Sequence, residues 1–113
     1  MKDPIQRKFI FTSDGVTHDV TVSETSEALT SCQNYSWAVT PLPSGITGGT
    51  PKYTIEVSND GVIWFEYNSL STNISIDDAV DDIHLAFTQM RIVHISSGAT
   101  GGTVEYLMTQ KYT

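Results

Sequence analysis

Hydrophobic and polar residues alternate along several segments of the chain, and this alternation predicts β-strands. It is clearest over residues 16–22, 53–58 and 104–109, where apolar side chains tend to occupy every second position. Successive side chains of a strand point to opposite faces of a sheet, so a period of two gives one core face and one solvent face. Residues 62–65 and 92–95 are instead apolar on both faces, which indicates cover on both sides, either inside the domain or from a partner.

Turn residues separate these segments at regular intervals. Ser13-Asp14-Gly15 and Asn59-Asp60-Gly61 each stand between two strand-like segments. Asp and Gly tolerate the positive φ of tight turns, so both places predict hairpins. We predict eight short strands, at residues 8–12, 16–22, 35–40, 52–58, 62–67, 73–76, 89–96 and 103–112. This pattern is typical of a single-domain, all-β antiparallel sandwich, of jelly-roll or discoidin-like type.

Helix is expected to be scarce. The best candidate is one or two turns over residues 77–85, capped by Asp77 or Asp78, and a bare loop is an equal alternative. Residues 1–7 are expected to form a solvated N-terminal arm of the single domain 1–113, because Lys2, Arg7 and the adjacent Lys8 bring cations there.

One heptapeptide is repeated. Ser-Gly-Ile-Thr-Gly-Gly-Thr at 44–50 recurs as Ser-Gly-Ala-Thr-Gly-Gly-Thr at 97–103. We interpret both copies as glycine-rich hairpin loops and expect them at the same end of the sandwich. Glycine allows close approach of a partner's backbone, so the candidate contact residues are Gly48, Gly49, Thr50, Gly101, Gly102 and Thr103. The alternative is that the glycines only satisfy turn geometry.

Composition and charge narrow the function. The formal net charge is −7 with six Lys and Arg in total, so we expect no nucleic-acid binding, which needs clustered cations. No apolar stretch approaches the roughly 20 residues of a membrane helix, and the N-terminus has no signal-peptide core. We therefore expect a soluble protein made in a cytoplasm, with no membrane partner. The lone Cys32 allows no intrachain disulfide.

The titratable residues form no recognisable catalytic or metal-binding pattern. His18, His84 and His94 form no ligand-spaced motif, and no nucleophile or phosphate-loop motif is present. We therefore expect no enzyme activity, no cofactor and no metal site. An acidic cluster leaves one question open, whether it binds a cation such as Ca²⁺ or is a solvated loop; it consists of Asp77, Asp78, Asp81 and Asp82.

Aromatic residues offer a second candidate chemistry. Trp37 and Trp64 would stack on sugar rings if their faces were exposed, whereas buried rings would belong to the core. Exposure of either ring beside polar groups would distinguish the two interpretations.

Residues 53–64, Tyr-Thr-Ile-Glu-Val-Ser-Asn-Asp-Gly-Val-Ile-Trp, resemble the S-x-D-G-x-x-W hairpin of discoidin-type domains. With the later strand 90–95 and the Gly/Thr-rich loop that follows, they also resemble small β-sandwich structural proteins of tailed-phage virions. The chain lacks the terminal cysteine pair of discoidin domains, which favours the phage-like resemblance.

That resemblance implies a non-enzymatic virion protein, either a capsid decoration (cement) protein or a small tail or fibre component. It would be made in the host cytoplasm and would contact other virion proteins. The two-sided apolar segments 62–65 and 92–95 predict a homo-oligomer, for which we expect a trimer. The alternative is a carbohydrate-binding module that uses exposed Trp or Tyr side chains.

Overall fold

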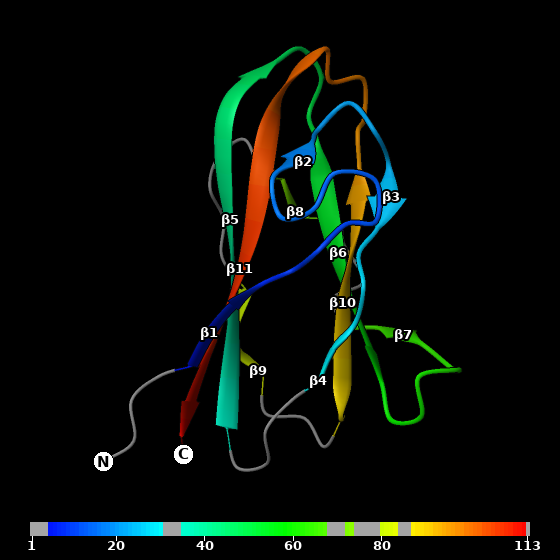
Figure 1. Ribbon diagram of the computed structural model, residues 1–113, viewed down its shortest axis with the longest axis vertical. Coiled ribbons are helices and arrows are strands. Elements are labelled where there is room, and N and C mark those ends of the chain that lie inside the picture. Colours follow the sequence, from blue (N-terminus) through cyan, green and yellow to red (C-terminus); the bar gives the residue numbers. More distant parts are fainter. Residues whose placement is uncertain (1–4, 31–34, 68–71, 74–79, 84–86, 113) are drawn as a thin grey trace.

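The structure, a computed structural model, describes residues 5–30, 35–67, 72–73, 80–83 and 87–112; for 35–37, 72–73, 80–83 and 111–112 it describes the backbone alone. Two antiparallel sheets pack face to face as a β-sandwich (Figure 1), which confirms the predicted fold class. The strands are β1 (Ile5–Lys8), β2 (His18–Asp19), β3 (Glu24–Thr25), β4 (Leu29–Thr30), β5 (Tyr35–Thr47), β6 (Lys52–Ser58), β7 (Phe65–Glu66), β8 (Thr72–Asn73), β9 (Val80–Ile83), β10 (Gln89–Ile95) and β11 (Gly101–Tyr112).

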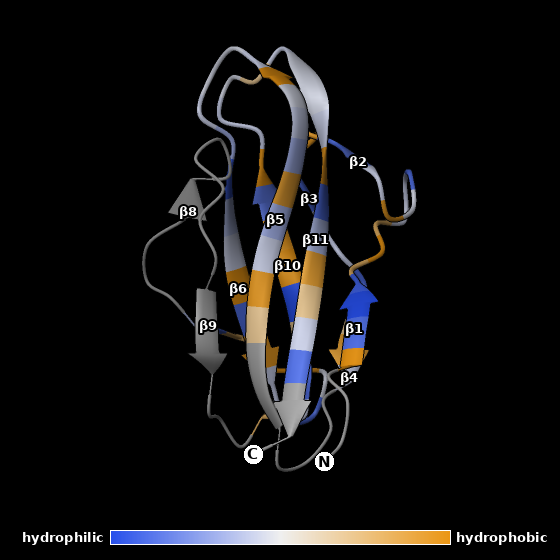
Figure 2. Cartoon of the chain, turned by 90° about the vertical axis from the view of Figure 1, so that its left-hand side faces the viewer, coloured by the Kyte–Doolittle hydropathy of each residue, from blue (hydrophilic) through white to orange (hydrophobic). Residues whose placement is uncertain are grey.

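Each sheet is built on one pair of long strands. The first sheet has the order β1-β11-β5-β9, and β2 also pairs with β11. The second has the order β3-β10-β6-β7, with β4 also on β10 and β8 also on β6. Figure 2 shows β5 and β11 of the first sheet in front, with β6 and β10 behind them. Short strands therefore flank the two long pairs.

The core lies between the two sheets. In β10 every second residue is buried, and the buried set is Met90, Ile92 and His94. Rings from both sheets meet there, with the centroids of Tyr53 and Tyr106 5.1 Å apart. Aromatic pairs of this kind add about 0.5–1.5 kcal/mol beyond their area burial. The buried apolar residues are Phe9, Phe11, Val20, Val39, Tyr53, Ile55, Val57, Met90, Ile92, Val104, Tyr106 and Met108.

Three predicted strands are found with bounds that agree within two residues, namely β6, β10 and β11. The predicted strand 35–40 is too short, because β5 continues to Thr47 through Pro41 and Pro43. Proline lacks an N–H and is tolerated where a strand edge is open. The pairing of β9 with β5 reaches only from Trp37 to Val39, so both prolines lie beyond it.

Segments 16–22 and 62–67 were predicted as strands over their whole length, but each supplies only the two residues of β2 or β7. In both segments aspartate side chains accept backbone N–H groups. Asp19 accepts from the Thr21 N–H, and Asp60 accepts from those of Val62 and Ile63. These local bonds replace ladder bonds and convert most of each segment into turns.

The predicted helix at 77–85 and the predicted arm at 1–7 both contain strand residues in the structure. The helix prediction for 77–85 is wrong at Val80–Ile83, which form β9; its other residues lie outside the described ones. The arm prediction for 1–7 is wrong for residues 5–7, because β1 pairs with β11 from Ile5 to Lys8. The predicted strand 8–12 shares only Lys8 with β1 and is wrong for residues 9–12, where Phe11 forms an isolated bridge with Gly15. β8 replaces the predicted strand 73–76, of which only Asn73 is described.

The repeated segments connect strands of different sheets, so the interpretation as hairpin loops is wrong. Residues 48–51 lead from β5 to β6, and residues 96–100 lead from β10 to β11. We call these two connections the arches. They lie side by side at one end of the sandwich (Figure 1), which confirms the predicted common location. Backbone hydrogen bonds hold them together. The Thr50 N–H donates to Ser97 O at 3.2 Å, and the Thr100 N–H donates to O of Thr47, the last residue of β5, at 2.8 Å.

Candidate functional site

The arches pack backbone against backbone. A Cβ on Gly49 would lie 2.4 Å from the carbonyl carbon of Gly98, and one on Gly102 would lie 2.6 Å from the Cα of Ile46. Both glycines also have positive φ, 58° at Gly49 and 111° at Gly102. Their lack of a side chain is therefore required by close approach within the chain itself. Their contact with a partner stays a prediction.

These contacts follow the repeat. Gly49 meets Gly98 just as Gly102 meets Gly45, and the two pairs occupy equivalent positions of the heptapeptide. Between them the hydroxyl oxygens of Thr47 and Thr100, again equivalent residues, lie 3.1 Å apart. The repeat thus builds a pseudo-twofold closure of the sandwich at its arch end.

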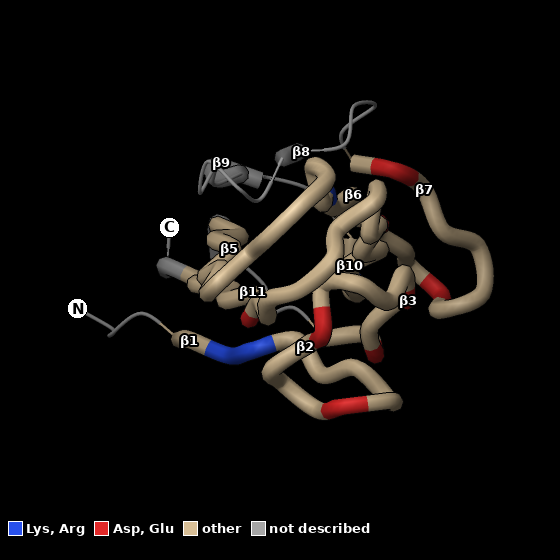
Figure 3. Tube along the Cα trace, turned by 90° about the horizontal axis from the view of Figure 1, so that it is seen from above, with Lys and Arg blue, Asp and Glu red and all other residues tan. Residues whose placement is uncertain are grey.

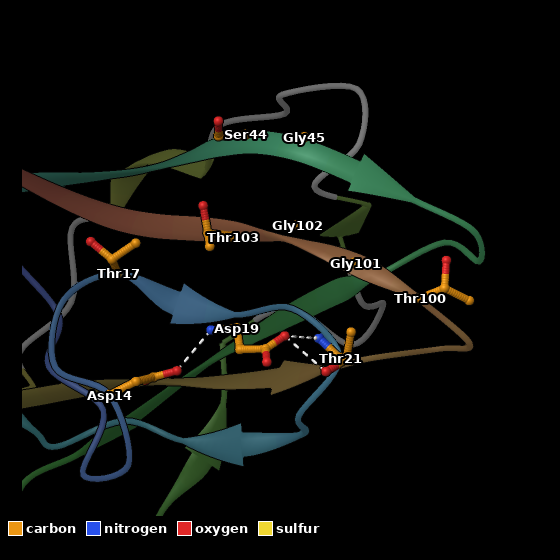
Figure 4. A pocket seen from close by; sticks show the side chains of 10 residues that line it. All are labelled: Asp14, Thr17, Asp19, Thr21, Ser44, Gly45, Thr100, Gly101, Gly102 and Thr103. Carbon is orange, nitrogen blue, oxygen red and sulfur yellow. Dashed lines mark hydrogen bonds between the residues drawn. The ribbon is translucent and has the colours of Figure 1, made fainter.

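A groove of about 600 Å³ lies beside this closure, between the β2 segment and the ends of β5 and β11 (Figure 4). Its side chains carry only hydroxyl or carboxylate groups. Three of the candidate contact residues line it, Gly101, Gly102 and Thr103, whereas Gly48, Gly49 and Thr50 do not. The full lining is Asp14, Thr17, Asp19, Thr21, Ser44, Gly45, Thr100, Gly101, Gly102 and Thr103.

Two aspartates fix the β2 side of the groove. Asp14 accepts the Asp19 N–H at 2.8 Å and lies 2.9 Å from His18 Nδ1. Burial alone would raise the pKa of Asp14, but the hydrogen bonds from Asp19 and His18 lower it below its usual value. Hydrogen bonds from the Thr21 N–H and hydroxyl lower the pKa of Asp19. Both side chains are therefore held as carboxylates.

His18 and His94 are buried beneath the groove rather than exposed in it. The His18 ring stacks on Phe11 with centroids 4.0 Å apart and lies 4.9 Å from the His94 ring. His94 Nε2 lies 2.9 Å from Val20 O, and its Nδ1 lies 2.7 Å from the Tyr106 hydroxyl. Burial lowers the pKa of His94 and raises that of Tyr106, so both stay neutral. These groups belong to the core and do not line the groove.

A second surface feature is the turn between β6 and β7. Val62, Ile63 and Phe65 are 80%, 58% and 57% exposed. We call these three residues the hairpin tip. Asp60 Oδ1 accepts the N–H groups of Val62 and Ile63 at 2.8 and 2.9 Å, and these bonds lower the pKa of Asp60. The tip is thus apolar, exposed and locally ordered.

Residues 92–95 are less exposed than the hairpin tip and offer less apolar surface for an interface. Ile92 and His94 are fully buried, and Val93 and Ile95 are half-buried. Val93 and His94 also pair with Thr25 and Glu24 of β3. The two apolar faces of this segment are therefore largely covered within the chain, and the expectation of an oligomer rests on the hairpin tip.

The tryptophans give limited support to sugar stacking. Trp64 is half-buried, and the Arg91 guanidinium carbon lies 4.0 Å from its ring centroid. Arg91 is held in turn by Glu56, with Nε 2.7 Å from Oε1. One face of the Trp64 ring is therefore occupied. The Trp37 side chain lies outside the described residues.

Of the residues that the structure describes, no Lys or Arg lines the groove. Figure 3, viewed from the arch end, shows Asp and Glu around β2 and β3, whereas Arg7 and Lys8 lie on β1. Within the described residues, no group of three or more His, Cys, Asp or Glu could hold a metal ion. Asp77 and Asp78, like Cys32 and His84, lie outside the described residues, and the side chains of Asp81 and Asp82 do too.

No protein-family model and no curated protein matches the chain. No helix in the described part of the chain is long and apolar enough to span a membrane. Functional inference therefore depends on the chemistry of the groove and the hairpin tip.

Sequence reasoning identified the repeat but not the groove beside it. The available signal was the alternation of Thr17, Asp19 and Thr21, which places three polar side chains on one face of a strand-like segment. Nothing in the sequence indicated that this segment lies next to β11, because Thr103 and Asp19 are far apart along the chain and pair only in the fold.

Proposed function

We propose that the protein is a non-enzymatic structural protein of a tailed-phage virion, either a capsid decoration protein or a small tail or fibre component. The observation that supports this best is the hairpin tip, where Val62, Ile63 and Phe65 are each more than half exposed. Clustered apolar side chains on an ordered turn are typical of protein contact sites. The S-N-D-G-x-x-W hairpin that positions them carries the resemblance to virion sandwiches.

The tip would act by burying its apolar side chains against neighbouring subunits of the virion, other copies of this chain among them. Asp60 holds the turn in place before binding, so little conformational entropy is lost on contact. Binding only to the assembled particle stabilises that particle by mass action. The protein would be made in the host cytoplasm and would function in the virion.

Mass spectrometry of purified particles tests the class directly, and we expect the protein beside a major capsid or tail protein. The tip is tested by adding purified protein to particles that lack it. Val62→Ser, Ile63→Ser and Phe65→Ser together should abolish binding. The variant should still unfold cooperatively, with a slightly lower melting temperature because the centroids of the Phe65 and Phe87 rings lie 6.4 Å apart in the wild type. Val22→Ser, at a separate exposed valine, is the matched control and should bind normally. Absence from particles, or full binding by the triple variant, contradicts the proposal.

Sugar binding at the tryptophans is the weaker alternative. Carbohydrate rings stack on free aromatic faces, and the Arg91 guanidinium lies over the ring of Trp64. Quenching of tryptophan fluorescence by saccharides, with loss of the effect in Trp64→Ala, would support it.

A further inference from the structure

The arch-end groove has a lining of unusual uniformity. Every one of its side chains is a hydroxyl or a carboxylate, and its other residues are glycines. We propose that this groove binds an uncharged saccharide. This site is separate from the hairpin tip, because β6 runs from the arches to the opposite end of the sandwich before the turn into β7 (Figure 1). The inference therefore goes beyond the proposed function and does not rest on it.

The charge of the groove excludes most other ligand classes. No Lys, Arg or His lines it, while Asp14 and Asp19 do, so phosphates and sulfated chains would be repelled. No large apolar side chain lines it either, so an apolar ligand would find little to bury against. Together these two observations favour an uncharged ligand that is rich in hydroxyl groups.

A metal ion is a poor fit for the same groups. Only two carboxylates line the groove, and both oxygens of Asp14 already face partners, His18 Nδ1 and the Asp19 N–H. Ca²⁺ takes six to eight oxygen ligands, which this side of the groove does not gather. The groove therefore suits hydrogen bonding to hydroxyl groups better than coordination.

Three polar side chains of the groove lie side by side in a row on adjacent strands. Thr103 of β11 lies opposite Ser44 of β5 and opposite Asp19 of β2, so the three residues are neighbours across adjacent strands. Strands lie about 4.8 Å apart, which is close to the spacing of hydroxyls across one sugar ring. Among the described residues, the Ser44 and Thr103 hydroxyls and Asp19 Oδ2 make no hydrogen bond. They offer donors and acceptors to saccharide hydroxyls.

The groups around this row are fixed in place. Thr21 donates to Asp19, Thr17 donates to Glu105, and Thr100 lies against Thr47. Side chains that are already ordered lose little entropy when a ligand binds. The groove is therefore organised before the saccharide arrives.

Glycines form the rest of the groove surface. Gly45, Gly101 and Gly102 line it with backbone alone, and a Cβ on Gly45 would meet nothing within 4 Å, so there is open space for a sugar ring at that position. A second hollow of about 240 Å³ continues past Ser44 and Gly45 to Pro43 and Ile46. Together the two hollows fit an oligosaccharide better than a single sugar.

The test uses the whole chain labelled with ¹⁵N and four uncharged probes, cellohexaose, maltohexaose, isomaltohexaose and N-acetylchitohexaose. We expect at least one, at up to about 10 mM, to shift the amide resonances of Gly45, Gly101 and Gly102. The double variant Ser44→Ala with Thr103→Val should bind that probe about tenfold more weakly, because two hydrogen-bonding hydroxyl groups are lost. Neither side chain makes an internal bond, so the fold should be retained, as judged by the melting temperature.

Thr109→Val, on the same strand outside the groove, is the matched control and should bind normally. No groove shift with any of the four probes overturns the inference, and so does equal binding by the double variant. Shifts confined to the Trp64 indole overturn it as well and place the sugar at the tryptophan. None of these outcomes bears on whether the protein is found in particles, so the proposed function stands or fails separately.

Discussion

Glycines with similar backbone conformations have very different surroundings in this protein. Gly45 and Gly49 have φ of 64° and 58°, both in the left-handed region. A Cβ on Gly45 would meet nothing within 4 Å, whereas one on Gly49 would lie 2.4 Å from backbone atoms of the other arch. Conformational strain and steric overlap can therefore be separated by comparing the two positions.

We predict that Gly49→Ala destabilises the protein much more than Gly45→Ala does. Placing alanine in the left-handed conformation costs about 1–2 kcal/mol of stability, and this cost applies at both positions. Overlap with the facing backbone adds roughly 1–3 kcal/mol or more at Gly49. Urea unfolding of both variants measures the difference. Equal losses would mean that the arches do not pack as closely as the structure shows.

The same result bears on the contact role of the repeat. Because Gly49 packs against the other arch and Gly102 packs against Gly45 and Ile46 of β5, their substitution by alanine would change folding before it changed binding. Ser44 and Thr103 are better positions for a binding test, since their side chains project beside the groove without internal bonds (Figure 4).

His94 gives a prediction for pH dependence. Burial lowers its pKa in the folded protein, while in the unfolded chain it titrates near 6.5. Below about pH 6.5, His94 is therefore protonated in the unfolded chain but stays neutral in the folded protein until a lower pH. Stability contributed by neutral His94 is complete above that pH and is lost as the pH falls towards the folded pKa, with a slope of up to about 1.4 kcal/mol per pH unit.

Chemical denaturation between about pH 7.5 and 5 measures this slope. His94→Gln keeps an N–H for Val20 O but does not titrate, so its slope should be shallower even if its overall stability is lower. An identical slope in the variant would assign the effect to other groups. The carboxyl groups with lowered pKa act at lower pH, where their protonation removes further stability; they are Asp14, Asp19, Glu24, Asp60 and Glu105.

At the scale of elements, the Asp60 side chain makes three of the hydrogen bonds that hold the turn before β7. Asp60 accepts the N–H groups of Val62 and Ile63 and the hydroxyl of Ser58. We predict that Asp60→Ala leaves the sandwich intact but speeds hydrogen exchange of the Val62 and Ile63 amides about tenfold, because local opening no longer breaks these bonds. Asn59→Ala is the control, and Ile92 reports the core. Unchanged exchange at Val62 would show that the bonds do not order the tip.

How well each element was predicted depends on what holds it. β6 alternates clearly in the sequence and pairs with β10 along the full length of both strands, so local pattern and long-range pairing agree there. β9 could not be predicted, because Val80 and Ile83 pair with Val39 and Trp37 from a distant part of the chain. Its local sequence, rich in Asp, favours a cap or loop instead.

The arches illustrate the same limit. The repeat and its glycines are visible in the sequence, and they predicted two loops at one end of the molecule. Whether a loop turns within a sheet or crosses between sheets depends on which strands pair, and β5 pairs with β11 rather than with β6. The groove depends on that pairing too, since it brings Ser44 and Asp19 to either side of Thr103.

At the scale of the whole molecule, the two candidate surfaces differ in chemistry and place. The groove lies beside the arches and is polar, while the hairpin tip lies past the other end of β6 and is apolar (Figure 1). The net charge of −7 opposes close approach of copies, so self-association must come from apolar contact. The tip is the described surface where several strongly exposed apolar side chains gather.

We therefore predict that the protein self-associates through the tip, as a trimer. Light scattering should give three times the monomer mass. Val62→Ser with Ile63→Ser and Phe65→Ser should give a monomer that still folds, because exposed side chains contribute little to the core, and its melting temperature should no longer depend on protein concentration. Leu42→Ser, at an exposed leucine on β5, should leave the trimer intact. Raising the salt concentration should strengthen association by screening the repulsion between acidic copies. A wild-type protein that stays monomeric at every concentration would remove the soluble trimer and confine any tip contact to the assembled particle.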